Sequence, residues 1–244
     1  MKRNRFSEIF DLRNWLGVVE NLGELKTVRG AHWNLEIGSL SEANYRQSKS
    51  PALLFDEIPD YPKGFRVLTG ASNSPRRLGV ALRMGSEFTN ASLVKALRGK
   101  PIDWEAHAQE LPPELLTDSP VMENVLLGNR VNLDLFPTPF WHKHDGGRFI
   151  GTGDAVITQD PESGWVNVGS YRMMLQDEQT LSLFLEGPRH ARFMIQKYWD
   201  QGKPAPIAVS FGHHPLLQLV AGIEVPAGVS EYEYAGTFTN SPYE

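Results

Sequence analysis

Histidines paired at short spacing are the residues with the most direct chemical potential in this sequence. His142 and His144 stand two positions apart, and Asp145 follows them. Residues two apart share one face of a strand, so these side chains have the types and spacing of a metal site. Gly146-Gly147 comes next and indicates a turn, which favours the alternative of a polar loop at the base of a hairpin.

Other local motifs for catalysis are weak. His213 and His214 adjoin Gly212, a position typical of histidines that hydrogen-bond backbone groups around a turn. Gly151-Thr152-Gly153 lacks the third glycine of a dinucleotide fingerprint, and a strand is expected after it. The sequence contains no nucleophile elbow, no H-E-x-x-H motif and no Walker loop. Local motifs therefore identify no reaction by themselves.

The composition narrows the class of protein that positions these residues. The chain has 244 residues, a formal charge of -5 and 41% hydrophobic residues, which is typical of a folded globular protein. The acidic balance argues against a generic nucleic-acid or anionic-membrane surface. No apolar run reaches the ~18 residues that span a bilayer. The absence of cysteine excludes disulfides, thiolate metal sites and thiol catalysis, and we expect a cytoplasmic protein.

Apolar spacing and turn residues predict an amino-terminal mixed α/β domain over residues 1–115. A first helix is expected to be capped by Ser7 and to stop at Gly23. The other elements expected here are helices over 35–46, 74–84 and 91–98, a short apolar alternation over 25–28, and strands over 52–58 and 65–69.

Strands are expected to dominate residues 116–244, after the boundary that Leu111-Pro112-Pro113 suggests. The predicted strands cover 121–127, 131–135, 149–158, 165–174 and 206–211. Helices are predicted over 188–199 and 215–223, and Ser230 is placed to cap a last short helix. The Gly169-Ser170 stretch is expected to bend, because Asn167 and Arg172 would otherwise face opposite sides of one strand.

A series of motifs in the second half sharpens this interpretation. In chain order they are Glu123-Asn124-Val125, Trp141-His142 with Asp145–Arg148, Gly151–Gly153, Gly164–Arg172, Gly187–His190 and Pro226–Glu231. This ordered series resembles the UbiD family of prenylated-FMN-dependent decarboxylases. Ser50–Phe55, followed by Tyr61-Pro62, is similar to the amino-terminal domain of that family. The resemblance spans nearly the whole chain.

The resemblance implies an α+β fold, in which the amino-terminal mixed α/β domain precedes an incomplete split β-barrel flavin-binding domain. It also implies reversible decarboxylation of an aromatic or α,β-unsaturated carboxylic acid, with prenylated FMN as the electron-accepting group. In the family a divalent ion, usually Mn²⁺ (Mg²⁺ being the alternative), holds the flavin phosphate. Its ligands carry over onto Asn167, His190 and Glu231, and an amide oxygen, an imidazole and a carboxylate suit such an ion.

Further site residues follow from the same resemblance. Arg172 is expected to bind the substrate carboxylate, for which its planar donor fork is suited. Additional cofactor contacts are expected along the Asn167–Arg172 stretch and before His190, namely from Val168, Gly169, Ser170, Tyr171 and Arg189. A K⁺ ion is expected beside the divalent ion, held partly by backbone carbonyls of Val168, Val220, Ala221 and Ile223.

The resemblance also implies partners and a difference in length. A flavin prenyltransferase would supply the cofactor, and the full-length form would be a homo-oligomer. Family members are about twice as long, and their acid–base glutamate lies in an E-G-P-F-G-E type motif that this sequence lacks. We therefore expect the chain to be part of a longer decarboxylase, or to have its remainder on another polypeptide, and to be inactive alone.

Three alternatives stay open at this point. The chain could be a flavin-binding subunit without chemistry, or a silent assembly domain. It could also be a metal-dependent hydrolase that uses His142, His144, Asp145 and His213. Taken singly, Asn167 could be a strand amide, His190 a helix cap and Arg172 one half of a surface ion pair.

Overall fold

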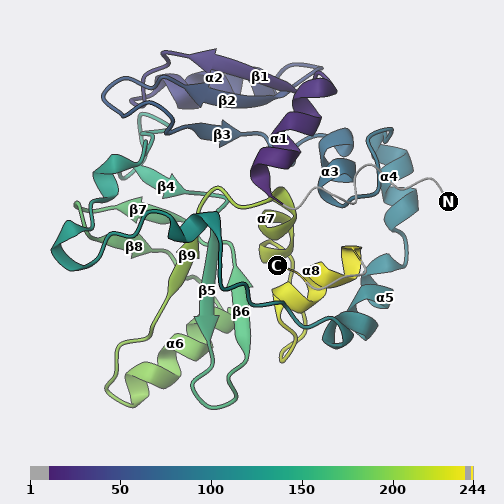
Figure 1. The fold of residues 1–244 in the computed structure, drawn as a ribbon, viewed down its shortest axis with the longest axis vertical. Helices are drawn as coiled ribbons and strands as arrows, with labels where there is room; N and C mark the ends of the chain where they lie inside the picture. The colour runs from purple at the N-terminus through teal and green to yellow at the C-terminus, as the bar shows by residue number, and fades with distance from the viewer. Residues whose placement is uncertain (1–10, 240–242, 244) are drawn as a thin grey trace.

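The computed structural model describes residues 11–239 and 243. Its described strands form three sheets of three strands each, and helices pack around them (Figure 1). This arrangement confirms a mixed α/β architecture. The predicted split β-barrel stays a prediction, because the strands described in the second half form two small separate sheets. No described helix is both long and apolar enough to cross a bilayer.

Helix α1 (Leu12–Asn21) begins one turn later than the sequence suggested. Asp11 caps it, because its carboxylate accepts a 2.7 Å hydrogen bond from the Asn14 N–H. Ser7, the expected cap, lies outside the described residues. The helix ends before Gly23, whose φ of +69° suits glycine. Its buried face, which includes Trp15, packs on the first sheet and on α3.

The first sheet has the order β1-β2-β3 and contains a parallel and an antiparallel pair. Its strands are β1 (Leu25–Arg29), β2 (Ala52–Asp56) and β3 (Val67–Thr69), and α2 (Glu36–Tyr45) connects the parallel strands β1 and β2. The described helices that follow are α3 (Pro75–Ala81), α4 (Asn90–Leu97) and α5 (Lys100–His107). The helices and strands predicted between residues 25 and 98 are present at these places, whereas α5 was missed by sequence reasoning.

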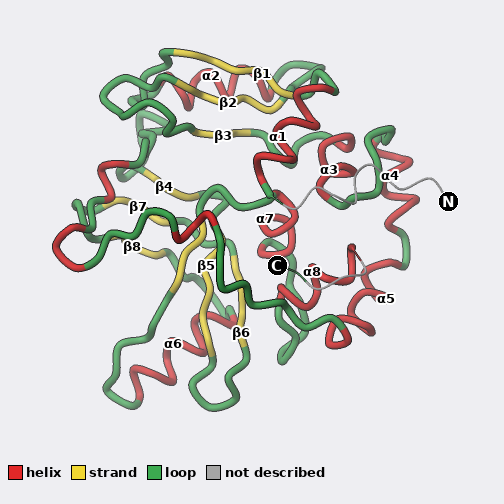
Figure 2. Tube along the Cα trace, in the orientation of Figure 1, coloured by secondary structure: helices red, strands yellow, loops and turns green. Residues whose placement is uncertain are grey.

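The connection between α5 and β4 is mainly loop with short helical turns (Figure 2). The strands predicted over 121–127 and 131–135 are wrong. The chain forms 3₁₀ turns instead: η1 (Ala108–Glu110), η2 (Pro120–Met122), η3 (Gly128–Arg130) and η4 (Leu133–Leu135). The prediction failed because these apolar residues are not buried; Val121, for example, is 78% exposed.

The strand predicted over 149–158 is two strands in different sheets. Strand β4 (Phe149–Gly151) pairs with β7 (Met173–Leu175), which pairs with β8 (Leu181–Leu183). Strand β5 (Ala155–Gln159) lies between β6 (Val166–Gly169) and β9 (Ala208–Ser210). The predicted strand over 165–174 is divided in the same way, so the loops after β4 and β6 lead from one sheet to the other.

Three helices cover the β6-β5-β9 sheet and position the site. They are α6 (His190–Asp200), α7 (Pro215–Ala221) and α8 (Glu231–Thr239), all at predicted places. Each of them contacts β6. Asn167, Val168 and Gly169 are consecutive and all buried, which a strand covered on one face alone would not allow. The three helices therefore bury most of β6.

Candidate functional site

The chain bends where β6 ends, as the sequence predicted. Ser170 has left the strand, and its N–H donates to the Ala221 carbonyl over 2.9 Å. A Cβ on Gly169 would lie 2.4 Å from the Tyr171 ring, so glycine is required for this close approach. Because of the bend, Asn167 and Arg172 line the same cavity.

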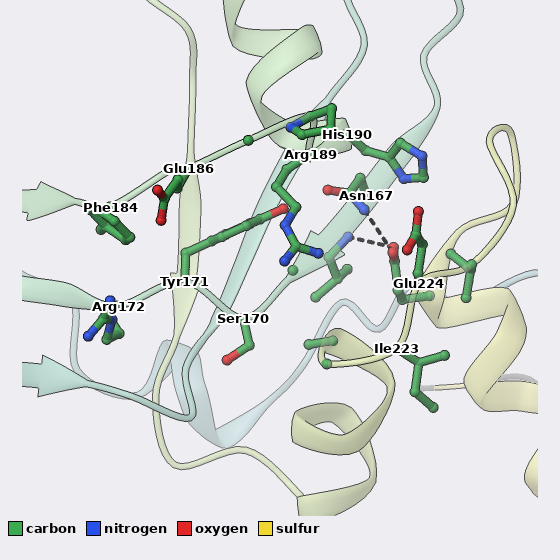
Figure 3. A pocket seen from close by; sticks show the side chains of 18 residues that line it. Asn167, Ser170, Tyr171, Arg172, Phe184, Glu186, Arg189, His190, Ile223 and Glu224 are labelled. Carbon is green, nitrogen blue, oxygen red and sulfur yellow. Dashed lines mark hydrogen bonds between the residues drawn. The ribbon is translucent and has the colours of Figure 1, made fainter.

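This cavity, called the β6 cavity below, has a volume of about 720 Å³ and opens between β6, the start of α6 and the start of α8 (Figure 3). Every residue predicted to contact the cofactor lines it: Asn167, Val168, Gly169, Ser170, Tyr171, Arg172, Arg189, His190 and Glu231. Of the predicted K⁺ residues, Val168, Ala221 and Ile223 line it, whereas Val220 lies in the hydrophobic core.

Glu231 is a buried carboxylate in the lining of the β6 cavity. It is 2% exposed, and its two carboxylate oxygens accept hydrogen bonds from Asn167 Nδ2 over 2.7 Å and from the Val168 N–H over 2.6 Å. Burial raises the pKa of Glu231 from 4.5 to about 7, and the two hydrogen bonds oppose that rise. Its position as first residue of α8 places the carboxylate beside free backbone N–H groups.

Only one of the two polar groups in the Asn167 side chain has a hydrogen-bond partner among the described residues. Its amide nitrogen bonds Glu231, but its oxygen Oδ1 is buried and accepts no hydrogen bond from any described residue. A buried acceptor without a partner is unfavourable unless a ligand satisfies it. An amide oxygen beside a carboxylate is a suitable ligand pair for a hard cation.

His190 supplies the third donor at the same end of the cavity. It is the first residue of α6, and its ring packs edge-on against Trp165 with 4.8 Å between centroids. Trp165 is fixed in turn, because its Nε1 donates to the Val229 carbonyl over 2.9 Å. Figure 3 shows His190 beside Asn167, whose amide nitrogen donates to the Glu231 carboxylate. The amide oxygen, the carboxylate and the imidazole are donor types that suit a divalent ion.

Arg172 lies at the other end, away from the Asn167–Glu231 pair (Figure 3). Its guanidinium stands 5.0 Å from the centre of the Phe184 ring, a cation–π contact that orients the donor fork. Arg172 also lines a second cavity of about 910 Å³ between the first sheet and β4. Arg172 can therefore contact a ligand in either cavity.

Tyr171 and Arg189 form the wall between these two ends. Burial raises the pKa of the Tyr171 hydroxyl, and the nearby Arg189 opposes that rise. In Figure 3 the Tyr171 ring extends toward Arg189. Arg189 is exposed and lines the same cavity, to which it contributes a positive charge.

Several residues of the site were missed by sequence reasoning. Trp165 packs on His190, Phe184 packs on Arg172, and Glu186 and Glu224 add two further carboxylates to the lining of the β6 cavity. Trp165 had a usable signal, since it precedes Asn167 by two positions in the chain. Phe184 and Glu224 lie in segments without a recognisable spacing.

The histidines of the hydrolase alternative do not form a metal site. His142 contacts Asp145, with 3.5 Å between Nδ1 and Oδ2, and His213 Nδ1 lies 3.1 Å from the Ser210 carbonyl. Over residues 11–239 and 243 no group of three or more His, Asp or Glu side chains could hold a metal. The polar-loop and backbone-bonding interpretations therefore describe these residues better.

Family models match both parts of the chain. Residues 16–97 match the 3-octaprenyl-4-hydroxybenzoate carboxy-lyase N-terminal domain, and residues 114–244 match the Rift-related domain of the same enzyme, the UbiD model. The chain belongs to the UbiD family. The resemblance inferred from the ordered motifs is thereby confirmed.

Individual relatives agree with this assignment. The chain is 33% identical to the pyrrole-2-carboxylic acid decarboxylase of Pseudomonas aeruginosa, over 96% of this chain and 48% of the relative. It is 26% identical to ferulic acid decarboxylase 1 of Candida dubliniensis, over 93% and 47% respectively. The chain thus spans about half the length of the curated relatives it matches.

Solved structures of UbiD-class enzymes share the fold. The HmfF enzyme of Pelotomaculum thermopropionicum in complex with FMN superposes with a TM-score of 0.79 at 28% identity, over 95% of this chain and 49% of that chain. An evolved dimeric form of HmfF in complex with prFMN superposes with a TM-score of 0.75 at 27% identity, over 96% of this chain and 51% of that chain. The vanillic acid decarboxylase of Sedimentibacter hydroxybenzoicus gives 0.80 at 24% identity over 95% and 48%, which supports the fold alone.

Proposed function

We propose that this chain provides the flavin-phosphate site of a UbiD-type decarboxylase that acts on an aromatic or α,β-unsaturated carboxylic acid. The observation that carries the proposal is the unsatisfied Asn167 oxygen, buried beside Glu231 and His190 in a cavity that all the predicted cofactor residues line. Family membership supplies the reaction class. Because the chain spans half of its relatives, the activity of the whole protein is part of the proposal.

Asn167, His190 and Glu231 would hold Mn²⁺ or Mg²⁺, and the ion would bind the phosphate of the flavin. A phosphate monoester carries about two negative charges near pH 7, which a partly buried site cannot hold without a cation. Arg189 in the cavity lining adds a further positive charge. We assign K⁺ to the neighbouring carbonyls of Val168, Ala221 and Ile223, which line the same cavity.

Prenylated FMN, when bound, supplies the electron-accepting ring on which loss of carbon dioxide depends. The residues of this chain bind and orient the substrate. Arg172 would hold the substrate carboxylate through two parallel N–H bonds, and Phe184 keeps the guanidinium in place. The apolar surface of the second cavity, which Arg172 shares, would exclude water from the reacting carbon.

Cofactor loading tests the proposal directly. The chain would be co-expressed with a flavin prenyltransferase, purified with Mn²⁺, and examined by absorption spectroscopy and mass measurement. We expect a bound flavin in wild type and in the H142A variant, and loss of the flavin in H190A. Retention of the flavin in H190A, or tight zinc binding without any flavin, would refute the assignment.

A further inference from the structure

The second cavity contains a buried carboxyl group that the proposed reaction leaves unused. Asp154 stands just before β5, is 2% exposed and lines this cavity together with Arg172. Neither of its carboxyl oxygens accepts a hydrogen bond from another described residue. Most buried carboxylates in folded proteins are paired, so a ligand in this cavity is the natural partner.

The local backbone is built around this carboxyl. A Cβ on Gly151 would lie 2.6 Å from Asp154 Cγ, so the carboxyl occupies the space that glycine leaves free. A Cβ on Gly153 would lie 2.3 Å from Gln218 Nε2, which fixes the other side of the turn against α7. The turn between β4 and β5 therefore holds Asp154 in a defined position.

The two charged groups of the cavity suggest the chemistry of its ligand. Arg172 offers donors for a carboxylate, and Asp154 offers an acceptor for an O–H or N–H group. Burial raises the pKa of Asp154 to about 6, so the group is mainly ionised at pH 7 to 8 and then lacks a counterpart. A hydrogen bond from a ligand would remove this unfavourable state.

We propose that Asp154 is a specificity residue that accepts a hydrogen bond from a ring N–H or O–H of the substrate acid, whose carboxylate binds Arg172. The inference rests on the proposed function for the class of ligand. It adds that the preferred acid carries a hydrogen-bond donor on its ring. The predicted occupant is thus a heteroaromatic or hydroxylated aromatic acid.

Calorimetric binding of matched acids tests this inference. The probes are pyrrole-2-carboxylate against furan-2-carboxylate and 4-hydroxybenzoate against 4-fluorobenzoate, titrated into the chain saturated with FMN and Mn²⁺ at pH 7.5. Wild type should prefer the donor-bearing acid of at least one pair about tenfold, the typical contribution of one hydrogen bond to a charged group. In D154L the ratio of the two affinities within a pair should fall to near one. In D154N the ratio should be smaller than in wild type.

Controls separate this role from a structural one. Asp145 lines the same cavity but contacts His142, so D145N should keep the wild-type preference. R172A should weaken the binding of all four acids by a similar factor. Without ligand, D154N should melt at the same temperature as wild type or higher at pH 8, because it removes a buried unpaired charge.

The outcomes distinguish a failure of the inference about Asp154 from a failure of the proposed function. If the acids bind wild type but D154L keeps the preference, or if D154N is strongly destabilised, the inference about Asp154 is wrong and the proposed function stands. If FMN binds but no acid binds wild type, the substrate part of the proposed function fails and the inference fails with it.

Discussion

Replacing Glu231 by glutamine separates the folding role of this residue from its proposed metal role. In the metal-free protein the Glu231 pKa is about 7, whereas an ordinary glutamate has 4.5. The unfolded chain therefore ionises first as the pH rises. The stability associated with the protonated, buried carboxyl is fully present below about pH 4.5 and is lost by about pH 7. Each pKa unit corresponds to 1.36 kcal/mol, so the total loss is about 3 kcal/mol.

The glutamine amide has nearly the shape of the protonated carboxyl and does not ionise. Its NH₂ group cannot accept one of the two hydrogen bonds that Glu231 accepts, but this loss is the same at every pH. The difference in unfolding free energy between E231Q and wild type should therefore grow by about 2–3 kcal/mol in favour of E231Q between pH 5 and pH 8. Groups common to both proteins cancel in this difference. The measurement is urea unfolding at several pH values in the presence of a chelator.

Mn²⁺ should shift the stability difference at pH 8 back in favour of wild type. Wild type should gain stability with rising Mn²⁺ concentration, and E231Q should gain little, because the ion loses its only carboxylate ligand among the three proposed. E186Q is the matched control, since Glu186 is an exposed carboxylate on the opposite side of the same cavity. A pH-independent difference between E231Q and wild type, or equal stabilisation of both by Mn²⁺, would refute this reasoning.

Further predictions concern the flavin, the substrate and the bend. H190A should lower Mn²⁺-dependent FMN affinity at least tenfold, whereas H142A should leave it unchanged, as measured by flavin fluorescence. R172K should weaken binding of aromatic acids about tenfold while FMN affinity is kept, because lysine cannot form the bidentate pair; an equal loss for FMN would argue against a substrate role. G169A should displace the ring of Tyr171 and destabilise the chain by about 1–3 kcal/mol, measured by chemical unfolding; wild-type stability would contradict the close approach.

The sequence predicted elements well where side chains are both periodic and buried. Helices α7 and α8 follow Pro215 and Ser230 as expected, and the Tyr232 N–H donates to Ser230 Oγ over 3.3 Å. The predicted strands over 121–135 failed because apolar composition alone does not provide a pairing partner or a surface to cover; Leu127 is 65% exposed. Burial is decided by the whole fold, which a local window does not contain.

Local sequence patterns were even less able to predict the site. Asn167 and Glu231 are 64 positions apart in the chain, and no local pattern could bring them to 2.7 Å. The ordered motifs of a known family supplied that information. Asp154 had no such support, because a lone aspartate after Gly151-Thr152-Gly153 looks like an ordinary turn residue. Its lack of a partner becomes visible only once the surrounding side chains are placed.

The proposed cofactor site depends most on a divalent ion that joins His190 to the flavin phosphate. Pulsed electron paramagnetic resonance of Mn²⁺ bound to the ¹⁵N-histidine-labelled chain with FMN tests this directly. We expect hyperfine coupling of the same Mn²⁺ to ³¹P and to ¹⁵N in wild type, and neither coupling in H190A. Manganese coupled to phosphorus without any histidine nitrogen, or unchanged spectra in H190A, would contradict the account.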